Sequence, residues 1–192
     1  MRVIGGSARG RRLRAPQGQR TRPTADRVRE ALFDLLAGYC SGARVLDLFA
    51  GTGALGIEAL SRGAESALFV ERAPEPLSAL RQNLEACGFA ERAEVRRGDA
   101  LRIVDSIARG GAGFDLVFLD PPYGRGLGRT ALAALAQSDL LAGGARVIVE
   151  SGTDEGEPTP ADSGGVLALE KTREYGDTTL WLYRAVERSD SC

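Results

Sequence analysis

The chain has 192 residues, of which 43% are hydrophobic and 27% charged, a composition typical of one globular domain with a small appendage. It has no histidine and only three widely separated cysteines, which excludes histidine triads, disulfide frameworks and zinc sites of the usual spacing. No apolar run reaches the ~20 residues that span a bilayer, and no apolar core follows the charged start. The sequence therefore predicts a cytoplasmic protein that binds neither a metal nor a membrane.

Charge is unevenly distributed, although the net charge is only −1. Residues 1–30 hold nine arginines against two acidic residues, a net of +7, so the rest of the chain carries −8. A basic arm on an acidic body favours a polyanionic partner held at one end. A solvated tail is the alternative, and the arginine excess throughout the chain is also consistent with genome composition alone.

The first 40 residues predict a small extension. Partly apolar segments at 2–4 and 11–14 flank a glycine-rich turn, which predicts a hairpin. Thr24 is a candidate N-cap for a helix that is ended by Gly38 and Gly42, because apolar residues recur at helical spacing after Thr24. We therefore expect a basic hairpin and helix over 1–40 and a second domain over 41–192.

Beyond residue 44, short apolar strands alternate with helices. Such strands mean a parallel sheet covered on both faces. After an acidic loop at 152–165, two last strands joined at Gly176-Asp177 predict an antiparallel hairpin at the sheet edge. The predicted fold is α/β with a seven-stranded, mostly parallel sheet, whose strands lie at 45–49, 67–71, 93–96, 114–119, 145–150, 166–175 and 178–186.

A glycine turn follows the first predicted strand. Gly51, Gly53 and Gly56 have the spacing of dinucleotide-binding turns, where missing side chains let a ligand approach the backbone. Ligands of open α/β sheets bind beyond the carboxyl ends of the strands. Asp47 would repel a pyrophosphate but suits a cationic amino acid and a sulfonium, which favours S-adenosylmethionine over NAD. The alternative is a tight turn that binds nothing.

Two further acids follow the next strands. Glu71 lies twenty residues after Gly51 and can accept hydrogen bonds from both ribose hydroxyls of an adenosine cofactor, or be a solvated strand-end acid. Asp99 can accept a hydrogen bond from an adenine amino group or cap the next helix, and the two roles are compatible.

The tetrapeptide 120–123, Asp-Pro-Pro-Tyr, is the most specific motif of the chain. The lone pair of an arylamine is delocalised into its ring, so the nitrogen is a poor nucleophile. A carboxylate at Asp120 and the rigid carbonyl of Pro121 can hold its two hydrogens and aim the lone pair at a methyl donor. Tyr123 can stack on a base that is out of its helix. A proline-terminated strand with a surface tyrosine is the alternative.

These motifs resemble those of the class I, Rossmann-like S-adenosylmethionine-dependent methyltransferases, and the tetrapeptide resembles their amino-methylating branch. Within that branch the chain is similar to the bacterial 16S ribosomal RNA guanine-N2 methyltransferases of the RsmD type. The N-terminal segments narrow the resemblance to this family. Four segments carry it, namely 2–11, 22–33, 55–64 and 114–123.

The resemblance implies methyl transfer to guanine N2 of 16S ribosomal RNA, for which we expect a direct in-line mechanism. A short basic arm on a compact domain favours a large structured partner, such as a small ribosomal subunit or an assembly intermediate, with naked RNA as the alternative substrate. The resemblance also implies that 41–192 is the S-adenosylmethionine-binding catalytic domain. Target-base handling is expected at Asp120, Pro121, Pro122 and Tyr123. Cofactor binding is expected at Asp47, Phe49, Ala50, Gly51, Thr52, Gly53, Glu71, Asp99 and Ala100. RNA contacts are expected at Arg9, Arg11, Arg12, Arg22, Arg27 and Arg29. The acidic loop 152–165 departs from the family pattern.

Other functions use parts of the same pattern. An adenine-N6 DNA methyltransferase or a protein-glutamine methyltransferase can use the same tetrapeptide. A target-recognition insertion would favour the DNA enzyme, and the sequence shows none. An NAD-dependent oxidoreductase fits the glycines but leaves the tetrapeptide unexplained. A non-catalytic RNA-binding assembly factor fits the basic arm but needs no carboxylates at four strand ends.

Overall fold

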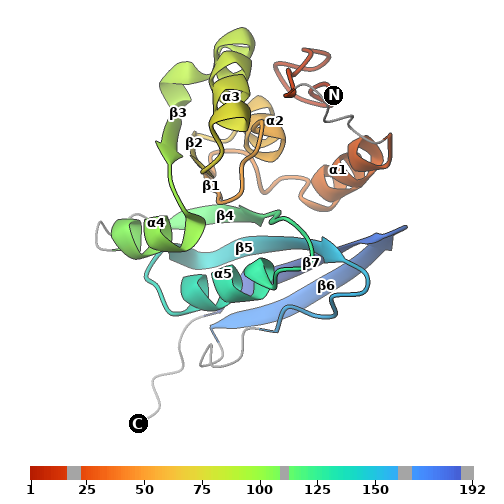
Figure 1. Ribbon diagram of the computed structural model, residues 1–192, viewed down its shortest axis with the longest axis vertical. Coiled ribbons are helices and arrows are strands. Elements are labelled where there is room, and N and C mark those ends of the chain that lie inside the picture. The colour runs from red at the N-terminus through yellow and green to blue at the C-terminus, as the bar shows by residue number, and fades with distance from the viewer. Residues whose placement is uncertain (17–22, 109–112, 160–165, 187–192) are drawn as a thin grey trace. The chain divides into compact units, whose positions relative to one another are not determined.

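The computed structural model describes residues 1–16, 23–108, 113–159 and 166–186 (Figure 1). The predictions made for Arg22 and for 160–165 lie outside these ranges. The chain divides into two compact units, Met1–Asp99 and Ala100–Cys192. None of the helices in the described ranges is long and apolar enough to cross a membrane.

The first unit contains a three-stranded parallel sheet in the order β3-β2-β1. β1 and β2 are short and largely buried because their apolar residues are continuous, as predicted, whereas β3 at the edge is more polar and has no buried residue. α3 begins with a proline at its first position and ends at Gly88, whose φ of 74° suits a left-handed helix cap. The elements are β1 (Arg44–Asp47), α2 (Ala54–Ser61), β2 (Ser66–Glu71), α3 (Pro74–Cys87), the 3₁₀ turn η1 (Ala90–Arg92) and β3 (Ala93–Arg97).

The N-terminal extension lies in the same unit. The predicted hairpin is confirmed by an antiparallel bridge between Arg2 and Arg12. α1 (Pro23–Leu35) begins one residue before the predicted cap Thr24, so that cap is wrong. Proline suits a first helical position, because its fixed φ is helical and its missing N–H would have no partner there.

The second unit contains four strands in the order β4-β5-β7-β6. β5 runs parallel to β4 and antiparallel to β7, which in turn pairs antiparallel with β6. β5 is longer than predicted at both ends, because Leu141 pairs with Phe114 of β4 and Gly152 pairs with Thr178 of β7. The elements are α4 (Ala100–Ile107), β4 (Phe114–Leu119), α5 (Leu127–Ala136), β5 (Leu141–Gly152), β6 (Leu167–Tyr175) and β7 (Thr178–Ala185).

The strand order β3-β2-β1-β4-β5-β7-β6 is that of a seven-stranded mixed sheet. It confirms the predicted α/β class, with an antiparallel hairpin that ends the sheet at β6. In such a sheet, the carboxyl ends of the parallel strands are where ligands bind.

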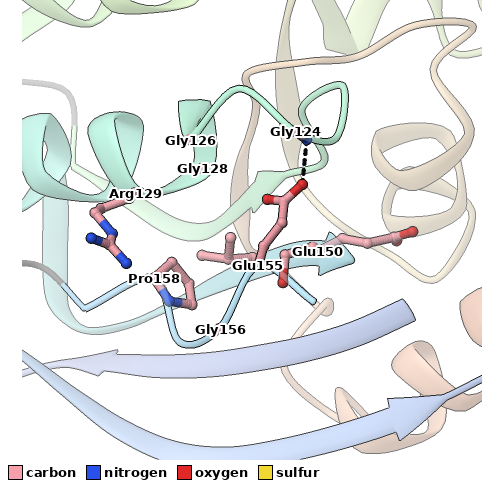
Figure 2. A pocket seen from close by; sticks show the side chains of 10 residues that line it. Gly124, Gly126, Gly128, Arg129, Glu150, Glu155, Gly156 and Pro158 are labelled. Atoms are coloured by element: carbon pink, nitrogen blue, oxygen red, sulfur yellow. Dashed lines mark hydrogen bonds between the residues drawn. The ribbon is translucent and has the colours of Figure 1, made fainter. Parts of the chain in front are cut away.

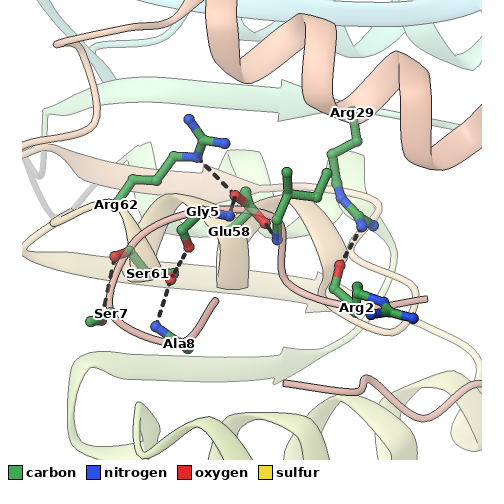
Figure 3. Close-up of polar contacts among 9 residues, drawn as sticks. Arg2, Gly5, Ser7, Ala8, Arg29, Glu58, Ser61 and Arg62 are labelled. Atoms are coloured by element: carbon green, nitrogen blue, oxygen red, sulfur yellow. Dashed lines mark hydrogen bonds and ion pairs between the residues drawn. The ribbon is translucent and has the colours of Figure 1, made fainter. Parts of the chain in front are cut away.

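Residues 4–8 of the extension are docked on α2 (Figure 3). Both oxygens of the buried Glu58 carboxylate accept backbone hydrogen bonds, from Ile4 at 2.7 Å and from Gly5 at 2.8 Å. Ser61 adds a further anchor, since its hydroxyl donates to the Gly5 carbonyl and accepts from the Ala8 amide. The start of the basic arm is therefore fixed against the first unit.

Gly6 allows this close approach. Its φ is +74°, and a Cβ there would lie 1.8 Å from the Ser61 carbonyl oxygen. Gly10 has a similar φ of +83°, but a Cβ there would meet no atom within 4 Å. The two glycines thus share a left-handed conformation and differ in contact.

We expect Gly6→Ala to detach residues 4–8 from α2, because the left-handed strain of about 1–2 kcal/mol is joined by a backbone clash. Gly10→Ala, the matched control, carries the strain alone. Hydrogen exchange of the Ile4 and Gly5 amides measures the docking. Protection lost in Gly6→Ala and kept in Gly10→Ala is the expected result, and equal protection in both variants would contradict it.

Candidate functional site

The glycine turn of the first unit is held by two carboxylates from neighbouring strands. Glu71, at the end of β2, accepts a hydrogen bond from the Gly51 amide at 2.9 Å. Asp47, at the end of β1, accepts one from the Gly56 amide at 3.1 Å. The turn closes with a 2.7 Å hydrogen bond from the Gly53 amide to the Ala50 carbonyl. The structure therefore brings Asp47, Glu71 and the glycine turn together.

The three glycines of the turn have different physical roles. A Cβ on Gly51 would meet no atom within 4 Å. In contrast, a Cβ on Gly53 would lie 2.3 Å from Leu80, and one on Gly56 would lie 2.3 Å from the ring of Phe69. At Gly53 and Gly56 packing within the protein already excludes a side chain, whereas the cofactor contact predicted for the turn stays a prediction. Gly51 alone of the three faces open space.

Asp47 is fully buried, and its Oδ1 has no partner of hydrogen-bond geometry. Burial raises the pKa of this carboxyl to about 7, with a smaller contribution from the charge of Glu71. The backbone N–H groups of Gly56 and Phe49 oppose this rise. A buried carboxylate with an unsatisfied oxygen is costly, and this oxygen would be stabilised by a nearby cation.

Glu71 and Asp99 follow neighbouring strands. The second Glu71 oxygen accepts a hydrogen bond from the Ala73 amide at 2.6 Å. The Gly98 amide donates to the Glu71 carbonyl at 3.2 Å, which brings the segment before Asp99 close to the end of β2. Asp99 is exposed and directly precedes α4, the position of an N-cap.

The tetrapeptide lies in the second unit, directly after β4. Pro121 is buried, and its ring packs close to Gly128 of α5, where a Cβ would lie 3.5 Å from it. Asp120 is half-buried, whereas Pro122 and Tyr123 are exposed. The packed ring of Pro121 fixes one point of this loop, and the rigidity of the whole tetrapeptide stays a prediction.

Tyr123 is 47% exposed, yet its hydroxyl is held from two strands. It donates to Oε1 of Glu150 on β5 at 2.9 Å and lies 3.3 Å from the hydroxyl of Thr178 on β7. Burial raises the pKa of the Tyr123 phenol, and the charge of Glu150 raises it further. Burial likewise raises the pKa of Glu150. No sequence motif indicates Glu150 or Thr178, because only the pairing of β5 with β7 brings them to Tyr123.

A cavity of about 330 Å³ lies beside this loop (Figure 2). Glycines on both sides of it leave the space open, and Arg129 of α5 borders it. Glu155, from the acidic segment after β5, accepts a hydrogen bond from the Gly124 amide, the residue after the tetrapeptide. The described part of the 152–165 loop is therefore anchored to the loop that carries Tyr123.

The predicted RNA-contacting arginines divide into two groups. Arg9, Arg11, Arg12 and Arg27 are exposed. Arg29 is 5% exposed, and its guanidinium donates to the Arg2 carbonyl at 2.6 Å and pairs with Asp26. The prediction of an RNA contact at Arg29 is therefore wrong, because this guanidinium is used inside the protein to hold the arm. Among the described residues, no three acidic or cysteine side chains are grouped as a metal site requires.

The fold is that of Rossmann-like methyltransferases, and the glycine turn with its two carboxylates lies at the carboxyl ends of β1 and β2, where such folds bind their ligands. An RNA methyltransferase from Salinibacter ruber, solved with S-adenosyl-L-homocysteine, shares this fold with a TM-score of 0.64 at 18% identity over 91% of this chain and 98% of its own. The family model described as "Conserved hypothetical protein 95" matches residues 1–184, and the chain belongs to this family.

Two relatives cover nearly the whole chain. The Ribosomal RNA small subunit methyltransferase D of Escherichia coli is 38% identical over all of this chain and 93% of its own length. The solved structure of yhhF from Escherichia coli has a TM-score of 0.85 at 38% identity, over 97% of this chain and 98% of its own. The similarity therefore includes the N-terminal arm as well as both units.

The raised pKa of Asp47 predicts how stability depends on pH. A carboxyl with a higher pKa in the folded state favours folding below about pH 4, and this contribution is lost as the pH rises towards 7. Relative to Asp47→Asn, the wild-type protein should therefore lose up to about 4 kcal/mol of unfolding free energy between pH 4 and 7, at 1.36 kcal/mol per pKa unit. Urea unfolding at several pH values measures this difference. The exposed Asp105→Asn is the control, and a constant difference for Asp47→Asn would contradict the assignment.

Proposed function

We propose that this chain uses S-adenosylmethionine to methylate the exocyclic N2 of a guanine in 16S ribosomal RNA. The observation that carries the proposal is the full-length similarity to the Ribosomal RNA small subunit methyltransferase D of Escherichia coli. The Asp120–Tyr123 loop after β4 supports chemistry at an amino group. The guanine and its N2 atom come from the resemblance of the sequence motifs.

The glycine turn fits the cofactor. Gly51 leaves open space at the end of β1, and the unsatisfied Oδ1 of Asp47 suits a nearby positive charge. Glu71 would accept hydrogen bonds from ribose hydroxyls, and Asp99 from the adenine amino group. When bound, S-adenosylmethionine supplies a methyl group already activated by its sulfonium. The proposed cofactor-binding residues are Asp47, Phe49, Ala50, Gly51, Thr52, Gly53, Glu71, Asp99 and Ala100.

The tetrapeptide would orient the methyl acceptor. The Asp120 carboxylate and the Pro121 carbonyl each accept a hydrogen bond from one N–H of the amino group. These two hydrogen bonds turn the nitrogen lone pair out of conjugation with the base. Tyr123, held by Glu150 and Thr178, stacks on the base, and Pro122 stiffens the loop. The amino group loses its proton late, to Asp120 or to water. Positioning therefore supplies most of the catalysis.

The exposed arginines of the arm would bind the RNA backbone. Arg9, Arg11, Arg12 and Arg27 present guanidinium groups suited to bidentate phosphate contacts. We propose that the extension over 1–40 binds RNA and that 41–192 binds the cofactor and catalyses transfer. A short arm on a small chain favours a large structured partner, such as a small ribosomal subunit or its assembly intermediate in the cytoplasm.

Asp120→Ala should lower methyl transfer by about 100-fold or more, the cost of removing one oriented polar group from an active site. Cofactor affinity should be unchanged, because Asp120 is not among the proposed cofactor-binding residues. Single-turnover methylation and calorimetric titration with S-adenosylmethionine measure the two quantities. The exposed Asp139→Asn is the control for loss of a carboxylate, and retained turnover in Asp120→Ala would refute the role given to Asp120.

Transfer of radiolabelled methyl to small-subunit particles and to their RNA, followed by nucleoside analysis, tests the function itself. The substrates come from cells that lack the endogenous activity. We expect label in N2-methylguanosine of 16S RNA. Label in N6-methyladenosine would keep the chemistry and overturn the target. Cofactor binding without any label would favour a protein substrate or a non-catalytic assembly factor.

A further inference from the structure

Asn83 of α3 connects two segments that have different proposed roles. Its side chain is 1% exposed and belongs to neither the glycine turn nor the arginine-rich arm. Its amide nevertheless forms hydrogen bonds with both. The sequence offers no motif at this position, and Asn83 is absent from the proposed cofactor and RNA sites.

The contact with the arm is reciprocal. The Arg14 amide donates to Oδ1 of Asn83 at 2.7 Å, and Nδ2 of Asn83 donates to the Arg14 carbonyl at 3.1 Å. These two atoms therefore hold the backbone of Arg14 much as a neighbouring strand would. Arg14 also donates from its guanidinium to Gln82, but that contact is exposed and involves side chains alone.

The contact with the turn uses the same nitrogen. Nδ2 of Asn83 donates to the Thr52 carbonyl at 3.0 Å, between Gly51 and Gly53. A primary amide nitrogen has two hydrogens, and here one goes to the arm and the other to the turn. Because the amide is planar and buried, a rotation that follows one acceptor moves the donor away from the other.

We propose that Asn83 is a positioning residue that couples the cofactor-binding turn to the RNA-binding arm. The inference rests on the proposed function, which assigns the cofactor to the turn and the RNA to the arm. A cofactor that orders the Thr52 peptide would thereby order Arg14 and the arginines before it. By linkage, RNA on the arm would strengthen cofactor binding by the same factor.

The first test uses the wild-type protein without RNA. Hydrogen exchange of the Arg14 amide should slow when S-adenosylhomocysteine is added, because this amide donates to the residue that holds the turn. Unchanged exchange at Arg14, with the ligand shown to be bound, would overturn the proposal. This result is independent of whether the chain methylates RNA.

The second test measures coupling between the two ligands. We expect S-adenosylhomocysteine to tighten binding of small-subunit RNA to the wild-type protein by about fivefold or more, in the range usual for coupled sites. Asn83→Asp keeps the acceptor and the volume but loses both donors, so the factor should fall towards one. Gln82→Ala, the matched control, removes the guanidinium contact and an exposed contact with Ser78, and should keep the full factor.

The outcomes separate the inference from the proposed function. A factor of one in the wild-type protein, or an unchanged factor in folded Asn83→Asp, would overturn the coupling even if methylation of 16S RNA is observed. If Asn83→Asp does not fold, the exchange experiment on the wild-type protein decides alone. Slowed exchange at Arg14 in a chain that fails to methylate RNA would support the coupling and refute the proposed function.

Discussion

The first unit depends on how two carboxylates hold one turn. Glu71 binds the amide of Gly51, and Asp47 binds the amide of Gly56 from inside the core. Burying Asp47 costs stability, since its pKa rises to about 7 and one oxygen has no hydrogen bond. These two hydrogen bonds restrain the turn at Gly51 and at Gly56, on either side of the Thr52 peptide, before any ligand is present. Such preorganisation reduces the ordering that binding itself would require.

The basic arm is a docked part of the first unit through residue 14. Glu58 holds Ile4 and Gly5, and Asn83 holds the backbone of Arg14. The charge of the arm favours a polyanionic partner, with a solvated tail as the alternative. Docking favours a binding surface over a solvated tail, because a docked backbone holds its exposed arginines at set positions. An arm held in this way loses less conformational entropy when it binds a polyanion.

The acidic segment after β5 also contributes to the structure of the loop that carries Tyr123. Its composition departs from the family pattern, and the sequence assigns it no contact. In the second unit, Glu155 from this segment binds the backbone of Gly124, and Glu150 at the end of β5 binds the hydroxyl of Tyr123. Two acids thus hold the loop that carries the tetrapeptide. Their negative charge supports a local structure and need not face RNA.

The sequence by itself determined the α/β class, the strands and the motifs, because apolar runs and glycine spacing are local patterns. It also placed Asp47, Glu71 and Asp120 at strand ends, where the structure has them. Tertiary structure alone decided which groups meet: Gly56 packs against Phe69, Arg29 is buried against Arg2, and Asn83 binds residues 31 and 69 positions away. These partners are far apart in the sequence and meet only in the folded chain. A local pattern of residues therefore does not reveal them.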